Sequence, residues 1–211
     1  MYEETSYNWR GKDGTRIRVG VEPSHTLANV CRFVVDPPIY PDGAVHFADQ
    51  GKTAYSPLAK KLLDLDDVAE VLIAGDSVTV TTESHADWES LAPKIAEAIR
   101  IQIDSGDPCV TEEHKKSLPS PDVIREKVQT LIDTAINPAI SSHGGSVTLV
   151  NVIDNNVVLE FGGGCQGCGM AHVTLKYGVE RLIREHVPEV GQVLDTTDHA
   201  SGENPYYSRS S

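Results

Sequence analysis

The residues of this 211-residue chain best suited to chemistry are two cysteines three positions apart, Cys165 and Cys168. They lie in the sequence FGGGCQGCGM at residues 161–170, in which five of the ten residues are glycine. Glycines such as Gly164, Gly167 and Gly169 allow positive φ angles and a close approach of the backbone to a ligand. A helical pattern follows from about residue 171, and a helix N-terminus favours the thiolate form of a nearby cysteine. The segment is therefore predicted to present two thiolates to one centre.

Four kinds of chemistry use a CxxC pair. A haem attachment site needs histidine directly after the second cysteine, and glycine at position 169 excludes it. A thiol–disulfide oxidoreductase carries the motif near a βαβ pattern, whereas an antiparallel hairpin is expected before it here. Structural zinc needs two further ligands, which a second copy of the chain could supply in a zinc-bridged interaction protein. An iron–sulfur cluster is normally held by four thiolates. The last three chemistries stay open on the residues alone.

The count of cysteines limits how a cluster could be held. Apart from Cys165 and Cys168, the chain has only Cys31, in an expected strand, and Cys109, in an expected linker. We expect Cys31 to act as a small buried apolar residue and Cys109 to be an exposed spare thiol. Two thiolates per chain are half of a four-thiolate set, so a cubane cluster requires two chains related by a two-fold axis. A cluster shared in this way, near the surface, suits transfer to another protein.

The second half of the chain predicts the order α-β-β-α-β, with the CxxC loop between a strand and a helix. A helix opens at Ser120 and closes near Asn137 and Pro138. Strands at residues 146–152 and 157–161 flank a turn at 154–156, which is typical of a hairpin. A second helix follows from about residue 171, and residues 190–194 form a closing strand. The tail after residue 198 is expected to be frayed.

The first half predicts a mixture of strands and helices. Residues 15–21 alternate polar and apolar side chains, which indicates a half-buried strand, and residues 30–35 suggest another. Residues 71–74 and 78–80 flank Gly75 and Asp76, which is typical of a hairpin. Ser56 and Pro57 mark a helix start, and Asp87 caps a longer amphipathic helix. A proline-containing stretch at residues 106–120 has almost no apolar periodicity and is interpreted as a linker. The predicted fold class is α+β, with two small α/β domains at residues 1–105 and 121–211.

Composition excludes several classes of function. Lys and Arg total 18 against 31 Asp and Glu, so the net charge is −13. This balance argues against binding to nucleic acid and against docking on an anionic membrane. No apolar stretch approaches the roughly 18 residues of a membrane-spanning helix. The acidic, polar start does not resemble a signal peptide, so a cytoplasmic location is expected.

The residues around the cysteines resemble a known family. The sequences INPAISSHGGSV at residues 136–147 and GGGCQGCGMAHVTLKYGVE at residues 162–180 closely resemble the C-terminal domain of Nfu/NifU iron–sulfur carriers. The sequence DHASGENPYY at residues 198–207 is similar to the ending of bacterial NfuA-type proteins. The resemblance implies a homodimer without catalytic turnover, which binds one 4Fe–4S cluster through Cys165 and Cys168 of both chains. It also implies upstream scaffold proteins that supply the cluster and apo-proteins that receive it.

The first half is similar to the Nfu N-terminal domain. The similarity rests on EPSHTL at residues 22–27, YSPLA at residues 55–59 and ADW at residues 86–88. It implies that residues 1–105 contact client proteins.

Overall fold

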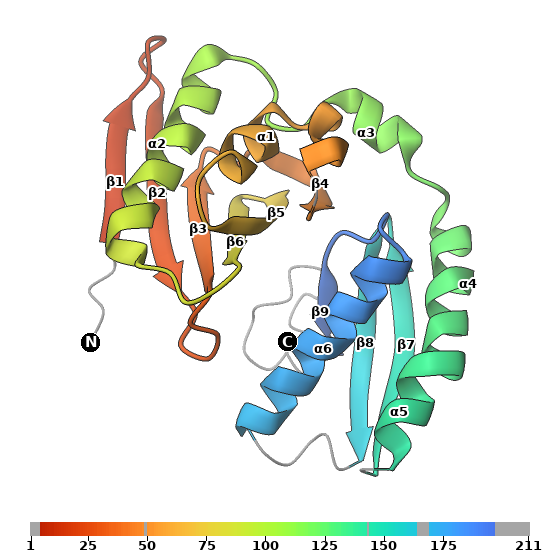
Figure 1. Ribbon diagram of the computed structural model, residues 1–211. Helices are drawn as coiled ribbons and strands as arrows, with labels where there is room; N and C mark the ends of the chain where they lie inside the picture. The colour runs from red at the N-terminus through yellow and green to blue at the C-terminus, as the bar shows by residue number, and fades with distance from the viewer. Residues whose placement is uncertain (1–4, 49, 143, 164–168, 197–211) are drawn as a thin grey trace, which may run out of the picture. The chain divides into compact units, whose positions relative to one another are not determined.

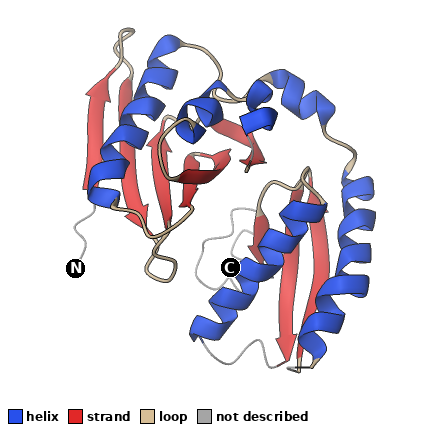
Figure 2. Cartoon of the chain, viewed as in Figure 1, coloured by secondary structure: helices blue, strands red, loops and turns tan. Residues whose placement is uncertain are grey.

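The computed structural model describes residues 5–48, 50–142, 144–163 and 169–196. The chain divides into two compact units, Met1–Leu118 and Pro119–Ser211. Each unit combines helices with its own β-sheet (Figures 1 and 2), which confirms the predicted α+β class.

The first unit is built on a six-stranded antiparallel sheet with strand order β1-β2-β3-β6-β5-β4. Its strands are β1 (Thr5–Arg10), β2 (Arg16–Pro23), β3 (Val30–Asp36), β4 (Tyr40–Phe47), β5 (Val68–Gly75) and β6 (Ser77–Thr82). Helices α1 (Pro57–Leu63) and α2 (Trp88–Ser105) cover one face of this sheet (Figure 1). Alternate strand residues such as Val19, Phe33 and Ile73 are buried in the core beneath these helices.

Local sequence signals account for the elements of this unit that were predicted. Ser56 caps α1, since its Oγ accepts a hydrogen bond from the Ala59 N–H at 3.0 Å. Asp87 caps α2 in the same way through the Glu89 N–H at 3.1 Å. Gly75, with φ of 59°, forms the tight turn between β5 and β6. The strands at residues 15–21 and 30–35, the hairpin and both helix starts are therefore confirmed.

Part of the segment interpreted as a linker is folded into the first unit. It contains a short helix, α3 (Glu112–Ser117), and the side chains of Cys109 and Val110 are buried in the core of the unit. The Ser56 hydroxyl donates to the Cys109 carbonyl at 2.7 Å, and the Thr111 N–H donates to the Tyr55 carbonyl at 2.8 Å. The expectation that Cys109 is exposed is wrong, because these bonds hold its segment against the start of α1.

The second unit contains a three-stranded sheet with strand order β7-β8-β9. Its elements are α4 (Pro121–Leu131), η2 (Ile132–Ile136), α5 (Asn137–Ser141), β7 (Gly145–Ile153), β8 (Asn156–Gly163), α6 (Gly169–His186) and β9 (Val193–Asp195). The order α-β-β-α-β and the hairpin turn between β7 and β8 are as predicted. The core is made by apolar residues of the helices, such as Ile124, Val128 and Ile183, with Val147 and Phe161 of the sheet.

The first helical segment of this unit does not close near Asn137 and Pro138 as expected. It continues to Ser141, because the turn at Ile132–Ile136 is a π-helix. The Asn137 N–H donates to the carbonyl of Ile132, five residues back, instead of four. Such a widened turn gives room for a proline, which otherwise clashes with the carbonyl four residues before it.

Candidate functional site

The candidate site lies between the end of β8 and the start of α6. Strand β8 ends at Gly163 and helix α6 begins at Gly169, so five residues join the two elements. Cys165 and Cys168, with Gly164 and Gly167, belong to these five and lie outside the described residues. Gly169 is the first residue of α6, two residues earlier than the predicted start near residue 171. The structure thus describes the two elements that position the cysteines.

The strand that leads to the cysteines is held on one side by β7. Gly145, Ser146 and Val147 pair with Gly163, Gly162 and Phe161 in an antiparallel ladder. A Cβ at Gly162 would lie 2.6 Å from the Ser146 hydroxyl, so a larger residue there would require the Ser146 side chain to turn away. The start of β7 and the glycine-rich end of β8 therefore approach each other closely, next to the five joining residues.

Asn137 fixes β7 on its other side. Its Oδ1 accepts from the Val147 N–H at 2.8 Å, and its Nδ2 donates to the Val147 carbonyl at 3.0 Å. A neighbouring strand would satisfy the same two backbone groups, so the carboxamide closes the free edge of β7 at this point. The sequence pattern alone does not reveal this role. The only available signal was the position of Asn137 within the family-like sequence at residues 136–147.

Helix α6 is anchored by its own apolar face. Val179 and Ile183 are buried in the core, and Leu175 packs against it. The helix has 18 residues and ends with Arg184 and His186 in its last turn. Basic residues at the end of a helix complement the helix dipole, whose positive end lies at Gly169, directly after Cys168.

The sheet of the second unit corrects one expectation about the CxxC motif. The sequence predicts an antiparallel hairpin, and no βαβ pattern, before this motif, which separates it from thiol–disulfide oxidoreductases. Strand β9 pairs with β8 in parallel, with Val157 next to Val193, and α6 connects the two strands. The motif therefore does lie at the strand-to-helix junction of a βαβ unit. Local periodicity could not predict this, because it does not give the direction of β9.

The two cysteines outside the motif are both buried in the first unit. Cys31 lies in β3 and is fully buried, as predicted, and Cys109 is 6% exposed. Burial raises the pKa of the Cys31 thiol to about 12 and that of the Cys109 thiol to about 11. Both thiols are therefore protonated near neutral pH. Since metals and clusters bind thiolates, neither residue is suited to be a ligand.

The described residues contain neither a further metal-binding group nor a membrane-spanning helix. In residues 5–48, 50–142, 144–163 and 169–196, no three His, Cys, Asp or Glu side chains come together in a group that could hold a metal ion. None of the described helices is both long enough and apolar enough to cross a membrane.

Comparison with known proteins identifies both units. Residues 26–106 match the family model described as "Scaffold protein Nfu/NifU N terminal", and residues 128–194 match the "NifU-like domain". Over 88 residues the chain is 52% identical to the "Fe/S biogenesis protein NfuA" of Pseudomonas savastanoi pv. phaseolicola, which covers 40% of this chain and 45% of the relative. It is 53% identical over 85 residues to the protein of the same name from Pseudomonas aeruginosa, which covers 40% and 44%. The chain thus spans less than half the length of these relatives.

A solved structure gives a weaker likeness. The solution structure of a NifU-like protein from Saccharomyces cerevisiae is 16% identical, with a TM-score of 0.40, and covers 53% of this chain and 95% of its own.

The fold and the matches define an α+β protein in which an N-terminal sheet domain precedes a small domain with a CxxC strand-to-helix junction. The protein is of the Nfu/NifU type, with an Nfu/NifU N-terminal domain followed by a NifU-like domain.

Proposed function

We propose that the protein is an iron–sulfur cluster carrier, which binds a 4Fe–4S cluster between two copies of the chain and transfers it to apo-proteins. Cys165 and Cys168 of each chain are the four ligands, and the carrier has no catalytic turnover. The curated relatives that match the chain over 88 and 85 residues are named Fe/S biogenesis proteins, which supports this class of function. The cytoplasm is the proposed location, with upstream scaffold proteins as the source of the cluster and no nucleic acid or membrane as partner.

The observation that carries this proposal is the burial of the other two thiols. Of the four cysteines in the sequence, Cys31 and Cys109 are enclosed in the core of the first unit. Only the CxxC pair remains to bind a cluster, and two thiolates per chain are half of a tetrathiolate set. The count supports a site completed by a second copy of the chain. The four-thiolate chemistry suits 4Fe–4S as the bound species.

The elements around the motif support the binding of a cluster. The ladder between Gly145 and Gly163 and the packing of α6 fix both ends of the five joining residues. The positive end of α6 lowers the cost of holding two thiolates and the negative charge of a cluster. The first unit, residues 1–105 in the domain division proposed from the sequence, is assigned to contact with client proteins. Residues 121–211 are assigned to the cluster.

Anaerobic reconstitution with iron and sulfide tests this function. We expect a brown protein with broad absorbance near about 400 nm and about four irons per two chains. Cys165→Ala and Cys168→Ala should each abolish the absorbance, whereas Cys31→Ala and Cys109→Ala serve as matched controls and should keep it. Incubation of the loaded protein with the apo form of a 4Fe–4S dehydratase should restore that enzyme's activity. A colourless, zinc-containing dimer would contradict the proposal.

A thiol–disulfide oxidoreductase is the second candidate, because the CxxC motif lies in a βαβ unit formed by β8, α6 and β9. This function requires catalytic turnover by a single chain and no iron. Reduction of insulin disulfides by the protein, lost in Cys165→Ala and combined with no iron uptake, would establish it in place of the carrier.

A further inference from the structure

Three arginines gather on one face of the sheet of the first unit, although the protein is acidic overall. Arg10 of β1 and Arg16 and Arg18 of β2 are all exposed, in a chain of net charge −13. The register of the two strands places Arg10 directly opposite Arg16, and Arg18 follows Arg16 two residues later. All three therefore share one face of the sheet, opposite the buried Ile17 and Val19. We call these three residues the arginine face.

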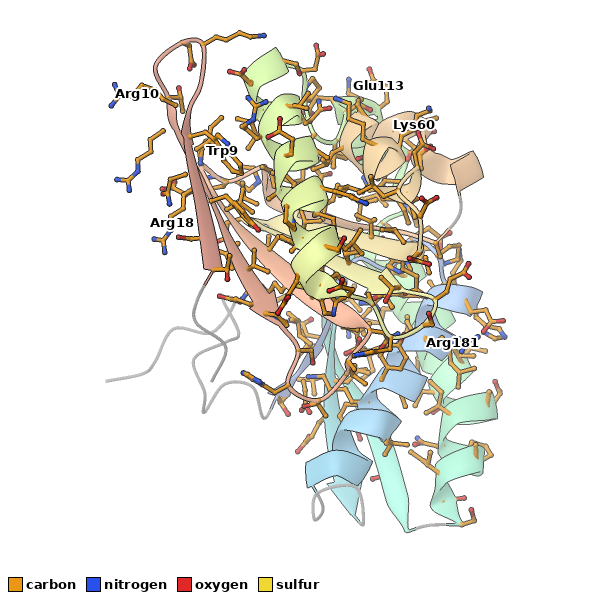
Figure 3. All side chains as sticks on the ribbon, turned by 60° about the vertical axis from the view of Figure 1, so that its left-hand side comes forward. Trp9, Arg10, Arg18, Lys60, Glu113 and Arg181 are labelled. Atoms are coloured by element: carbon orange, nitrogen blue, oxygen red, sulfur yellow. The ribbon has the colours of Figure 1, made fainter. Side chains whose placement is uncertain are left out.

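The arginine face is on the side of the sheet that α1 and α2 do not cover. Figure 3 shows Arg10 and Arg18 projecting away from the sheet on the side opposite α2, whereas Trp9 points toward the α2 side. Trp9 stacks on Tyr7, with ring centroids 5.7 Å apart, and packs against the core. The guanidinium groups thus extend from one face of β1 and β2, whereas the opposite face of these two strands packs against the core of the first unit.

Among the described residues, no carboxylate forms an ion pair with these arginines. The acidic side chains of β2 and of the turn between β1 and β2 have other partners. Glu22 pairs with Arg32 at 3.3 Å, and Asp13 accepts from the N–H and the hydroxyl of Thr15 at 2.9 and 2.8 Å. Asp36 lies across from Arg18 in the strand register, without an ion pair between them. Positive charge is therefore left in excess at Arg10 and Arg16.

This arrangement costs stability unless something compensates it. Like charges directly opposite each other on neighbouring strands repel. A charged side chain on an edge strand can serve to prevent edge-to-edge aggregation, which accounts for Arg10. It does not account for Arg16 and Arg18, because β2 is an inner strand paired on both sides. A bound anionic group would remove the repulsion.

The strand order points to a polypeptide as the source of the negative charge. Strand β1 is the edge of the described sheet, and an extended polypeptide segment can add to a sheet edge through its backbone, which a nucleic acid cannot do. The negative net charge of the chain also repels a long polyanion such as a nucleic acid. A short acidic segment interacts mainly with the charges within about one Debye length of it, which here are the three arginines.

We propose that the arginine face is a docking surface for an extended acidic segment of a partner protein, which lies along β1 with its carboxylates against Arg10, Arg16 and Arg18. The proposal rests on the proposed function only in taking that partner to be a protein that receives the cluster. Docking is measured on the protein without a cluster. Failure of the docking proposal therefore leaves cluster binding by Cys165 and Cys168 untouched, and failure of cluster binding leaves the docking proposal untouched.

Fluorescence anisotropy of a short fluorescein-labelled, glutamate-rich peptide with the full-length apo-protein tests the docking surface. We expect binding that weakens as KCl is raised, and a dissociation constant about tenfold higher for the triple variant Arg10→Gln, Arg16→Gln, Arg18→Gln. The triple substitution to lysine keeps the charge and should keep most of the binding. Circular dichroism verifies that each variant is folded.

The matched control removes three positive charges elsewhere, through Lys94→Gln, Lys116→Gln and Arg181→Gln, all at exposed positions. It should bind as tightly as the unmodified protein. An equal loss in this control would show a general charge effect and overturn the proposal. No binding of the peptide, or no loss in the Arg10, Arg16 and Arg18 variant, would also overturn it. An oligonucleotide of equal charge that binds more tightly through the same arginines would show a nucleic-acid site instead.

Discussion

The side-chain amide of Asn137 bonds to both backbone groups of Val147, accepting from its N–H at 2.8 Å and donating to its carbonyl at 3.0 Å. Val147 is the cross-strand partner of Phe161, four residues before Cys165. One side chain at the end of a π-helical turn therefore supports the strand pair that leads into the CxxC segment.

Replacing Asn137 with alanine removes both bonds and leaves two backbone groups at a partly buried strand edge without their partner. We expect Asn137→Ala to lower the free energy of unfolding of the second unit by about 1–3 kcal/mol. Urea unfolding followed by circular dichroism measures the change. Gln129→Ala is the matched control, because Gln129 is an exposed amide whose bond to Asp133 is confined to the surface of the helical segment. An equal effect of the two substitutions would contradict the role of Asn137.

Helices α1 and α4 both begin at a serine–proline pair, but replacing the serine with alanine is expected to destabilise the protein by different amounts. Ser56 is buried, caps α1 through the Ala59 N–H, and donates to the Cys109 carbonyl. Ser120 precedes Pro121 of α4, and its side chain makes no cap hydrogen bond. Ser56→Ala should therefore cost about 1–3 kcal/mol, and Ser120→Ala less than about 0.5 kcal/mol. Thermal unfolding of both variants checks the difference, and a larger loss in Ser120→Ala would refute it.

His114 of α3 predicts an acid sensitivity of the first unit. Its side chain is buried, with Nδ1 3.4 Å from the Tyr40 hydroxyl and its ring edge-on to Tyr55, and burial lowers its pKa below 6.5. The unfolded chain then binds a proton more readily than the folded chain, so this group reduces stability as pH falls below about 6.5. His114→Gln should therefore lose less stability than the unmodified protein between about pH 7.5 and about pH 5.5. The exposed His25→Gln is the control, and parallel pH curves for all three proteins would contradict the prediction.

The buried thiols of Cys31 and Cys109 predict a selective pattern of alkylation. Because burial raises the pKa of both, iodoacetamide at about pH 8 should modify two cysteines per native chain and all four after unfolding in urea. Peptide mass spectrometry should place the native labels on Cys165 and Cys168. The raised pKa values also mean that both thiols stabilise the folded state below about pH 9 and that this contribution is lost as pH rises toward 11 and 12. Rapid alkylation of Cys109 in the native protein would contradict the burial of this cysteine.

Where the sequence predicted the fold, the signal was local. Asp87 and Ser56 mark helix starts because their side chains cap the first turn, and Gly75 marks a hairpin because the turn requires a positive φ. The strands that were not predicted lack such signals. In β4 the pairing with β5 shifts register between Tyr40 and Ala44, so the period-2 pattern is interrupted.

The remaining differences depend on tertiary contacts. Pro138 would normally end a helix, and the π-turn before it cannot be read from apolar spacing. The burial of Cys109 depends on Ser56, which is 53 residues away in the sequence. For the candidate site, the two cysteines were identified from type and spacing alone, and their assignment as ligands stays a prediction. The support from Asn137 required the three-dimensional arrangement.

The central claim is that two chains share one cluster, and native mass spectrometry of the anaerobically reconstituted full-length protein tests it most directly. The account predicts that the mass of one 4Fe–4S cluster is found only on a species of two chains, and that Cys168→Ala chains carry none. A cluster of this mass on a single chain would contradict the account.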